Sequence, residues 1–317
     1  MIDQKAKTVW EAFAASTARW PDRPFLKVLP ETADVYGIAA GETSYAAARA
    51  EIDRLAAALD AAGIGAGHRV MLLLENRPAF FLWFLALNRL GASAVPLNPD
   101  LRAAELTYMM GHAEPVLAVA IPARCAELRQ AGDAAGVAIP VIAPQDPVPA
   151  PRDGARIALR DGPTEAALLY TSGTTGQPKG CVLTNTYFLA AGDWYANAGG
   201  LCALHEDGER MLTPLPIFHM NALAYSFMAM IAVGGCLTAL DRFHPRSWWQ
   251  SVRAARATCL HYLGVMPTML MGAEPSETDR DHDVRFGFGA GVDPKLHAAF
   301  EERFGFPLVE AWAMTET

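Results

Sequence analysis

The 317 residues of this chain are enough for one large domain or two medium ones with a buried core. Apolar residues make up 52% of the sequence and charged residues 19%, a composition that excludes a disordered chain. The net charge of -8, without a cluster of Lys and Arg, argues against nucleic acid as a partner. Five scattered cysteines without a CxxC pair indicate reduced thiols, so we expect a cytoplasmic protein without a zinc site.

Helical and extended patterns alternate in the first half of the chain. Ser44 is placed to cap a helix whose apolar residues share one face, and Gly63 is placed to end it. The uninterrupted apolar run at 70–74 is typical of a strand buried on both faces of a parallel sheet. Pro78 stands at the start of an apolar helix that Gly91 ends. The pattern further predicts a strand at 92–97, a helix at 103–111 and a strand at 116–121.

Residues 143–163 interrupt this alternation with prolines among Asp, Arg and Gly, and we interpret them as a linker or long surface loop. The sequence therefore predicts one α/β subdomain at 1–150 and a second at 164–317. The second is expected to contain strands at 166–170, 210–213, 236–240, 259–263, 284–288 and 307–310, and helices at 245–257 and 294–304. The alternation predicts an α/β fold of stacked subdomains, each with a largely parallel sheet and flanking helices.

The segment 222–240 carries no charged side chain and has the length of a membrane span. Gly234 and Gly235 interrupt it, however, and the residues after them have the pattern of a short strand following a buried helix. We therefore predict no integral membrane segment.

The segment from Tyr170 to Gly180 reads Tyr-Thr-Ser-Gly-Thr-Thr-Gly-Gln-Pro-Lys-Gly. Its glycines let backbone N–H groups converge on an anion, its hydroxyl groups add donors, and Lys179 adds a positive charge. A predicted strand leads into it, and α/β sheets bind ligands at the carboxyl ends of their strands. Pro178 stands where a Walker A loop needs glycine, which excludes that motif. The composition alone fits a flexible Ser/Thr/Gly loop equally well.

The ordered string resembles the phosphate-loop signature of the adenylate-forming (AMP-dependent synthetase/ligase) superfamily, which includes acyl- and aryl-CoA synthetases. Three later segments resemble further motifs of that family in the same order. Pro214 to His219 resembles its Pro-x-x-His segment beside the acyl pocket, and Phe288 to Gly291 resembles its adenine-binding turn. Trp312 to Glu316 resembles its Tyr-Gly-x-Thr-Glu motif. The resemblance implies an AMP-forming acid–CoA ligase, which uses ATP, Mg²⁺ and CoA to convert a carboxylic acid into acyl-CoA.

The resemblance also implies the roles of individual residues. The catalytic residues would be Thr315, at the α-phosphate, together with Lys179 and Glu316, and Glu316 would hold Mg²⁺. The substrate pocket would contain His219, Asn221, Ala313 and Met314. The ATP-binding residues would be Thr171, Ser172, Gly173, Thr174, Thr175, Gly176, Lys179, Gly289, Ala290, Gly291, Trp312 and Thr315.

Three positions depart from the family pattern. Trp312 stands where the family has tyrosine, Ala313 where it has glycine, and Asn185 where it has histidine after the phosphate loop. The family's ribose-binding Thr-Gly-Asp segment and its small C-terminal domain with a catalytic lysine are absent from the sequence. We therefore expect a truncated chain, the N-terminal part of the fold, which alone makes little or no acyl-CoA.

The substrate class is predicted only coarsely. Segments 241–249 and 256–261 most resemble carnitine/crotonobetaine-type CoA ligases, which favours a short or medium acyl acid, with an aryl acid as the alternative. Two other functions stay open: a degenerate, non-catalytic nucleotide-binding module, and an adenylation enzyme that loads a carrier protein. Exposed surface where the missing domain would dock favours a homo-oligomer.

Overall fold

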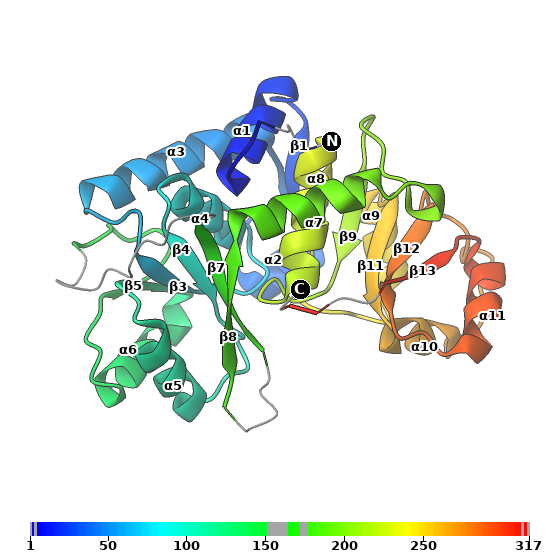
Figure 1. The fold of residues 1–317 in the computed structure, drawn as a ribbon. Coiled ribbons are helices and arrows are strands. Elements are labelled where there is room, and N and C mark those ends of the chain that lie inside the picture. Colours follow the sequence, from blue (N-terminus) through cyan, green and yellow to red (C-terminus); the bar gives the residue numbers. More distant parts are fainter. Residues whose placement is uncertain (1, 3–4, 151–163, 172–176, 312–313, 316–317) are drawn as a thin grey trace.

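A computed structural model of the chain describes residues 2, 5–150, 164–171, 177–311 and 314–315. Its strands form two sheets, with helices between them and on their outer faces (Figure 1). Sheet A contains β1 (Pro24–Val28), β2 (Gly41–Ser44), β9 (Arg210–Thr213), β10 (Cys236–Ala239), β11 (Cys259–Leu263), β12 (Phe286–Ala290) and β13 (Leu308–Glu310). Sheet B contains β3 (Arg69–Leu73), β4 (Ser93–Pro96), β5 (Leu117–Ala120), β6 (Val141–Ile142), β7 (Glu165–Thr171) and β8 (Lys179–Thr184).

Sheet A has the strand order β13-β12-β11-β9-β10-β1-β2, and sheet B has the order β6-β5-β3-β4-β7-β8. Neighbouring strands are parallel except for the pairs β1–β2 and β7–β8. The predicted α/β fold with largely parallel sheets is thereby confirmed.

The strands of the two sheets are not divided at the proline-rich segment 143–163. β1 and β2 precede it and join sheet A, whereas β7 and β8 follow it and extend sheet B beside β4. The two sheets therefore do not coincide with the predicted ranges 1–150 and 164–317, and the division into subdomains stays a prediction. The sheets differ from these ranges because hydrophobic periodicity identifies strands but not which sheet edge each strand joins.

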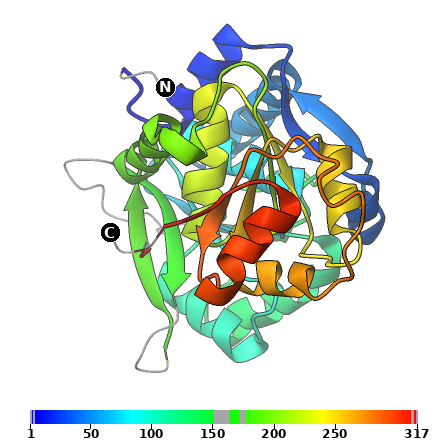
Figure 2. The same ribbon diagram turned by 90° about the vertical axis from the view of Figure 1, so that its right-hand side faces the viewer.

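The helices fill three layers around the two sheets. Their bounds are α1 (Val9–Arg19), α2 (Pro30–Tyr36), α3 (Tyr45–Ala61), α4 (Pro78–Arg89), α5 (Ala103–Ala113), α6 (Cys125–Ala134), α7 (Asn185–Asn197), α8 (Phe227–Val233), α9 (Trp248–Ala255), α10 (Val265–Met271) and α11 (Pro294–Phe304). Two 3₁₀ turns, η1 (Pro122–Arg124) and η2 (Gly200–Cys202), and a π-helical turn, η3 (Asn221–Ser226), complete the assignment. Helices α4, α7 and α8 share one core with both sheets, α5 and α6 cover the outer face of sheet B, and α10 and α11 lie outside sheet A (Figure 2).

Strand β3 shows why its apolar run is uninterrupted. Val70 and Leu72 belong to the core shared with α3 and α4, whereas Met71 and Leu73 belong to the core under α5 and α6. Because side chains alternate between the faces of a sheet, both faces need apolar residues here.

Helix boundaries follow local signals where the sequence contains them. The Ser44 hydroxyl accepts a hydrogen bond from the Ala47 N–H at 3.1 Å, and Gly63 has a φ of 82° just after α3. The helix expected at 245–257 is shorter, Trp248–Ala255, and the strand expected at 284–288 lies two residues later, at Phe286–Ala290. Within the described ranges, no helix is both long and apolar enough to cross a membrane.

Asn185 connects three elements at the start of α7. Its side-chain oxygen accepts hydrogen bonds from the Val9 N–H and the Asn88 amide, each at 2.9 Å. Its amide donates to the Thr164 hydroxyl at 2.8 Å. Asn185, which stands where the family has histidine, therefore links α1, α4 and the residue before β7 by hydrogen bonds.

We expect Asn185→Ala to lower the free energy of unfolding by about 1–3 kcal/mol, because a buried N–H loses its acceptor. Asn197→Ala is the matched control at the other end of α7, since among the described residues the Asn197 side chain bonds only to Asp193, in the same helix. Urea unfolding of both variants measures the difference. Equal losses of unfolding free energy in the two variants would show that the hydrogen bonds of Asn185 to α1 and α4 add no stability.

Candidate functional site

A cavity of about 820 Å³ opens where the carboxyl ends of β9, β11, β12 and β13 meet. In an α/β sheet this edge is where ligands bind, since loops diverge there and leave space between them. The cavity is lined by Trp194, Ala198, Cys202, Leu215, Pro216, His219, Met220, Asn221, Tyr225, Leu263, Phe288, Gly289, Ala290, Val309, Glu310 and Ala311.

The strand side of the cavity is built from closely approaching backbone. A Cβ atom on Gly289 would lie 2.2 Å from the Tyr262 carbonyl oxygen, and one on Gly264 would lie 1.6 Å from the Gly291 carbonyl oxygen. Gly291 itself has a φ of 80°, in the left-handed region that favours glycine. Glycine is therefore required at all of these positions for β11 and β12 to end as they do.

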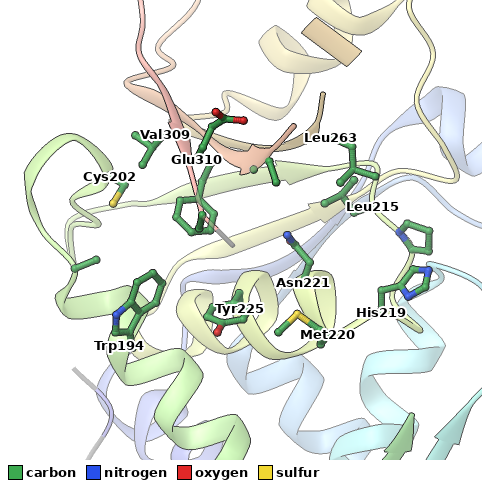
Figure 3. Close-up of a pocket in the computed structure, with 16 residues that line it drawn as sticks. Trp194, Cys202, Leu215, His219, Met220, Asn221, Tyr225, Leu263, Val309 and Glu310 are labelled. Carbon is green, nitrogen blue, oxygen red and sulfur yellow. The ribbon is translucent and has the colours of Figure 1, made fainter. Parts of the chain in front are cut away.

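The opposite side of the cavity consists of α7 and the π-helical turn η3. Figure 3 shows Trp194 on α7 and Tyr225 on η3 facing the space below β13. The rings of Trp194 and Tyr225 meet edge to face, with centroids 5.7 Å apart. π-Helical turns are rare and occur frequently at functional sites.

Asn76 holds the segment that carries His219. Its amide donates hydrogen bonds to the carbonyl oxygens of Leu215 and Leu240, at 3.0 and 2.8 Å, and its oxygen accepts one from the Ile217 N–H at 2.8 Å. Because Asn76 follows β3, this buried side chain connects the end of sheet B to the loop after β9.

His219 lines the cavity next to Phe218, with ring centroids 4.5 Å apart. Burial lowers the pKa of its imidazole below the ordinary 6.5, so the ring is neutral at pH 7. Its ring nitrogens have no protein partner in the part of the chain that the structure describes. A neutral, apolar-facing ring fits a pocket wall better than a proton carrier.

A second histidine lies behind the cavity wall. His261, in the middle of β11, is fully buried, and burial lowers its pKa to about 3. Its Nδ1 lies 2.7 Å from the Ser226 hydroxyl oxygen and 2.8 Å from Oδ1 of Asn221, and its Nε2 lies 3.0 Å from the Tyr195 hydroxyl oxygen. This polar group therefore reaches the cavity through Asn221.

The predicted phosphate loop connects β7 and β8, which form an antiparallel hairpin. Thr171 and Lys179 are paired across its end, at the border of 172–176, which lie outside the described residues. Helix α5 supports the hairpin, because the Tyr108 hydroxyl donates to the Pro178 carbonyl at 3.2 Å and His112 Nδ1 lies 2.7 Å from the Tyr170 hydroxyl oxygen.

The structure brings together His219, Asn221, Gly289 and Ala290 in one cavity, with Gly291 in the adjoining turn. Met314 is exposed and Thr315 is half-buried. The predicted residues Ser172, Gly173, Thr174, Thr175, Gly176, Trp312, Ala313 and Glu316 lie outside the described residues.

Sequence reasoning missed the helix side of the cavity, above all Trp194, Tyr225 and Cys202. No motif marks these residues, and the face that a helix turns to a cavity depends on tertiary packing. Glu310 was also missed; it ends β13, and its carboxylate accepts a hydrogen bond from the Val292 N–H at 2.8 Å.

Comparison with known proteins decides the family. The sequence profile of the family described as AMP-binding enzyme matches residues 13–317. The chain belongs to the AMP-binding enzyme family. Sulfoacetate–CoA ligase of Cupriavidus necator is 31% identical over 98% of this chain, and Crotonobetaine/carnitine–CoA ligase of Salmonella arizonae is 31% identical over 90%. Medium/long-chain-fatty-acid–CoA ligase of Mycobacterium tuberculosis is 30% identical over 98%.

This AMP-binding enzyme chain spans 60%, 58% and 51% of those three relatives, respectively. Solved structures share its fold at lower identity. A fatty acyl CoA synthetase of Mycobacterium tuberculosis has a TM-score of 0.80 at 22% identity, covering 99% of this chain and 61% of that one. An o-succinylbenzoate CoA synthetase of Bacillus subtilis in complex with AMP has a TM-score of 0.76 at 21% identity, covering 98% and 74%.

Magnesium needs few protein ligands at a nucleotide site, because waters and phosphate oxygens supply most of its six positions. Across the described ranges, no group of three His, Cys, Asp or Glu side chains gathers as a metal site. A single carboxylate beside the phosphates suits such an ion, and the predicted one, Glu316, lies outside those ranges.

The buried His261 makes stability depend on pH. Between pH 6.5 and about 3 the unfolded chain binds a proton at this ring and the native protein does not, so acidification favours unfolding. At pH 5 this amounts to about 2 kcal/mol. We expect the wild type to lose about that much more unfolding free energy than His261→Gln between pH 7 and pH 5. Parallel losses in urea titrations would contradict a neutral buried His261.

Proposed function

We propose that this chain forms the ATP- and acid-binding part of an AMP-forming acid–CoA ligase. The observation that carries the proposal is the single cavity lined jointly by Gly289, Ala290, His219 and Asn221, which the sequence assigns separately to an adenine turn and an acyl pocket. Family membership and the CoA-ligase names of the relatives support it. The ligands are then ATP, CoA and a small carboxylic acid.

In the proposed first step, an oxygen of the substrate carboxylate attacks the α-phosphorus of ATP, and the bond to the leaving pyrophosphate breaks. Two anionic groups must approach each other, so neutralisation and alignment supply most of the catalysis. Lys179 and the N–H groups of 172–176 would hold the β- and γ-phosphates, and Thr315 would contact the α-phosphate. Mg²⁺, held by Glu316, would further neutralise phosphate charge.

Adenine would lie against the Gly289–Gly291 turn with Trp312 stacked on it. The crowding against Tyr262 keeps Gly289 free of a Cβ, and backbone without Cβ atoms allows a flat ring to approach closely. In the second step the thiolate of CoA would attack the acyl carbonyl and AMP would leave. A cytoplasmic location and self-association stay predictions.

The acid would occupy the part of the cavity between η3 and β13, where Met220, Tyr225 and Val309 are apolar. A short or medium acyl chain fits this lining. An aryl acid is the second candidate, because Trp194, Tyr225 and Phe288 offer aromatic faces.

Lys179→Ala tests the nucleotide site. We expect binding of ATP to weaken about tenfold to a hundredfold, the loss of one hydrogen bond to a charged group, while binding of AMP stays unchanged. Lys295→Ala, on the exposed side of α11, is the control and should alter neither. Calorimetry with both nucleotides measures the difference. Equal loss of ATP and AMP binding would place Lys179 away from the outer phosphates.

A second test concerns the complete reaction. We expect purified residues 1–317, given ATP, Mg²⁺, CoA and a panel of acyl acids, to form little or no thioester, because the resemblance places a catalytic lysine in a segment outside residues 1–317. A complete acyl-CoA synthetase in the same assay is the positive control. Robust thioester formation by residues 1–317 would overturn this expectation.

A further inference from the structure

The proton positions around His261 follow from its partners. The buried Tyr195 hydroxyl has only His261 Nε2 as a hydrogen-bond partner within the described part of the chain. Its proton must therefore point at Nε2, because a buried hydroxyl without an acceptor is costly. Nε2 accepts, and the proton of the neutral ring is on Nδ1.

This tautomer fixes the orientation of the Asn221 amide. Nδ1–H donates to Oδ1 of Asn221 at 2.8 Å and to the Ser226 hydroxyl oxygen at 2.7 Å. The Ser226 hydroxyl in turn donates to the backbone carbonyl oxygen of Asn221 at 3.3 Å. An amide whose oxygen faces His261 must turn its NH₂ group the other way.

The NH₂ group of Asn221 therefore points into the cavity. Figure 3 shows the side-chain nitrogen of Asn221 directed from the π-helical turn into the space toward Glu310. Nδ2 has no protein partner among the described residues. A donor fixed from behind by a buried network, and open in front, is preorganised for a ligand acceptor.

The rest of the lining shows which acceptor fits. No Lys or Arg lines the cavity within the described ranges, so nothing there neutralises a second anionic group on the acid. Among the described lining residues Glu310 has the one carboxylate, which would repel such a group further and already accepts a hydrogen bond from the Val292 N–H. The remaining wall is largely apolar.

We propose that Asn221 is a specificity residue whose amide donates a hydrogen bond to an uncharged oxygen, such as a hydroxyl, on the chain of a short acyl acid, with His261 and Tyr195 as positioning residues. This rests on the proposed function of the cavity. A site built to donate to a substrate oxygen rejects the analogue that lacks the oxygen, because its own polar group is then left unpaired.

Acyl-sulfamoyl adenosines, stable mimics of the acyl-adenylate, test this on residues 1–317 by calorimetry. The matched probes are the butanoyl and 3-hydroxybutanoyl compounds, and the hexanoyl and 6-hydroxyhexanoyl compounds, with the sulfoacetyl compound as the anionic arm. We expect the wild type to bind at least one hydroxylated compound about tenfold or more tightly than its partner, and the sulfoacetyl compound weakest.

Asn221→Leu keeps the approximate volume and removes the donor. We expect the ratio of dissociation constants within the selected pair to fall to about one, while the plain acyl compound still binds. Tyr195→Phe keeps the ring that stacks on Phe288 and removes only the hydroxyl, so it should reduce the ratio in part by freeing the tautomer of His261. A structural lesion would instead weaken both members of a pair alike. If Asn221→Leu does not fold, as judged by circular dichroism, Asn221→Ala replaces it, since alanine also removes the donor.

The outcomes separate the two proposals. Equal binding of both members of each pair by the wild type, or an unchanged ratio in the Asn221 variant, would refute the specificity role and leave the ligase function standing. Tightest binding of the sulfoacetyl compound would also refute it. Failure of every compound to bind would refute the proposed function, and the inference with it.

Discussion

The backbone contact between the ends of β11 and β12 is the constraint on which the cavity depends. Gly264 and Gly291 approach so closely that a Cβ on the first would lie 1.6 Å from the carbonyl oxygen of the second. Two residue pairs back, Gly289 meets Tyr262 in the same way. No side chain can relieve such crowding, because both partners are main chain. The strands therefore end together, and the loops after them diverge around the cavity.

Behind that edge, a polar network passes through an apolar core. Burying His261, Tyr195 and Ser226 is tolerable only because each finds a partner, and the last partner, Asn221, stands at the cavity. The neutral ring also explains why no counter-charge is needed beside it. The need to pair these buried polar groups with one another therefore sets the direction of the Asn221 amide at the surface of the cavity.

The sequence predicted the elements that local rules determine. Met71 and its neighbours form a buried strand, Ser44 caps α3, and Gly289 and Gly291, in the predicted adenine turn, occupy positions that disfavour a Cβ. It did not predict that β1 and β2 join sheet A, since strand pairing is a long-range choice. Nor could it place Asn76 or Trp194 at the site, because each acts through residues distant in the chain and has no motif around it.

The two walls of the cavity differ in how they are made. This difference determines which properties of the cavity can be inferred from the relatives and which cannot. The wall at the ends of β11 and β12, where we propose that the nucleotide binds, is backbone, so any sequence that keeps its glycines keeps its shape. The opposite wall, where we propose that the acid binds, is made of side chains from α7 and η3, each of which can change without disturbing the sheet. Relatives at 30–31% identity are named for sulfoacetate, fatty acids and crotonobetaine or carnitine, three unlike acids. Substrate choice must therefore be derived from Asn221, Tyr225 and their neighbours in this chain, and not from the relatives.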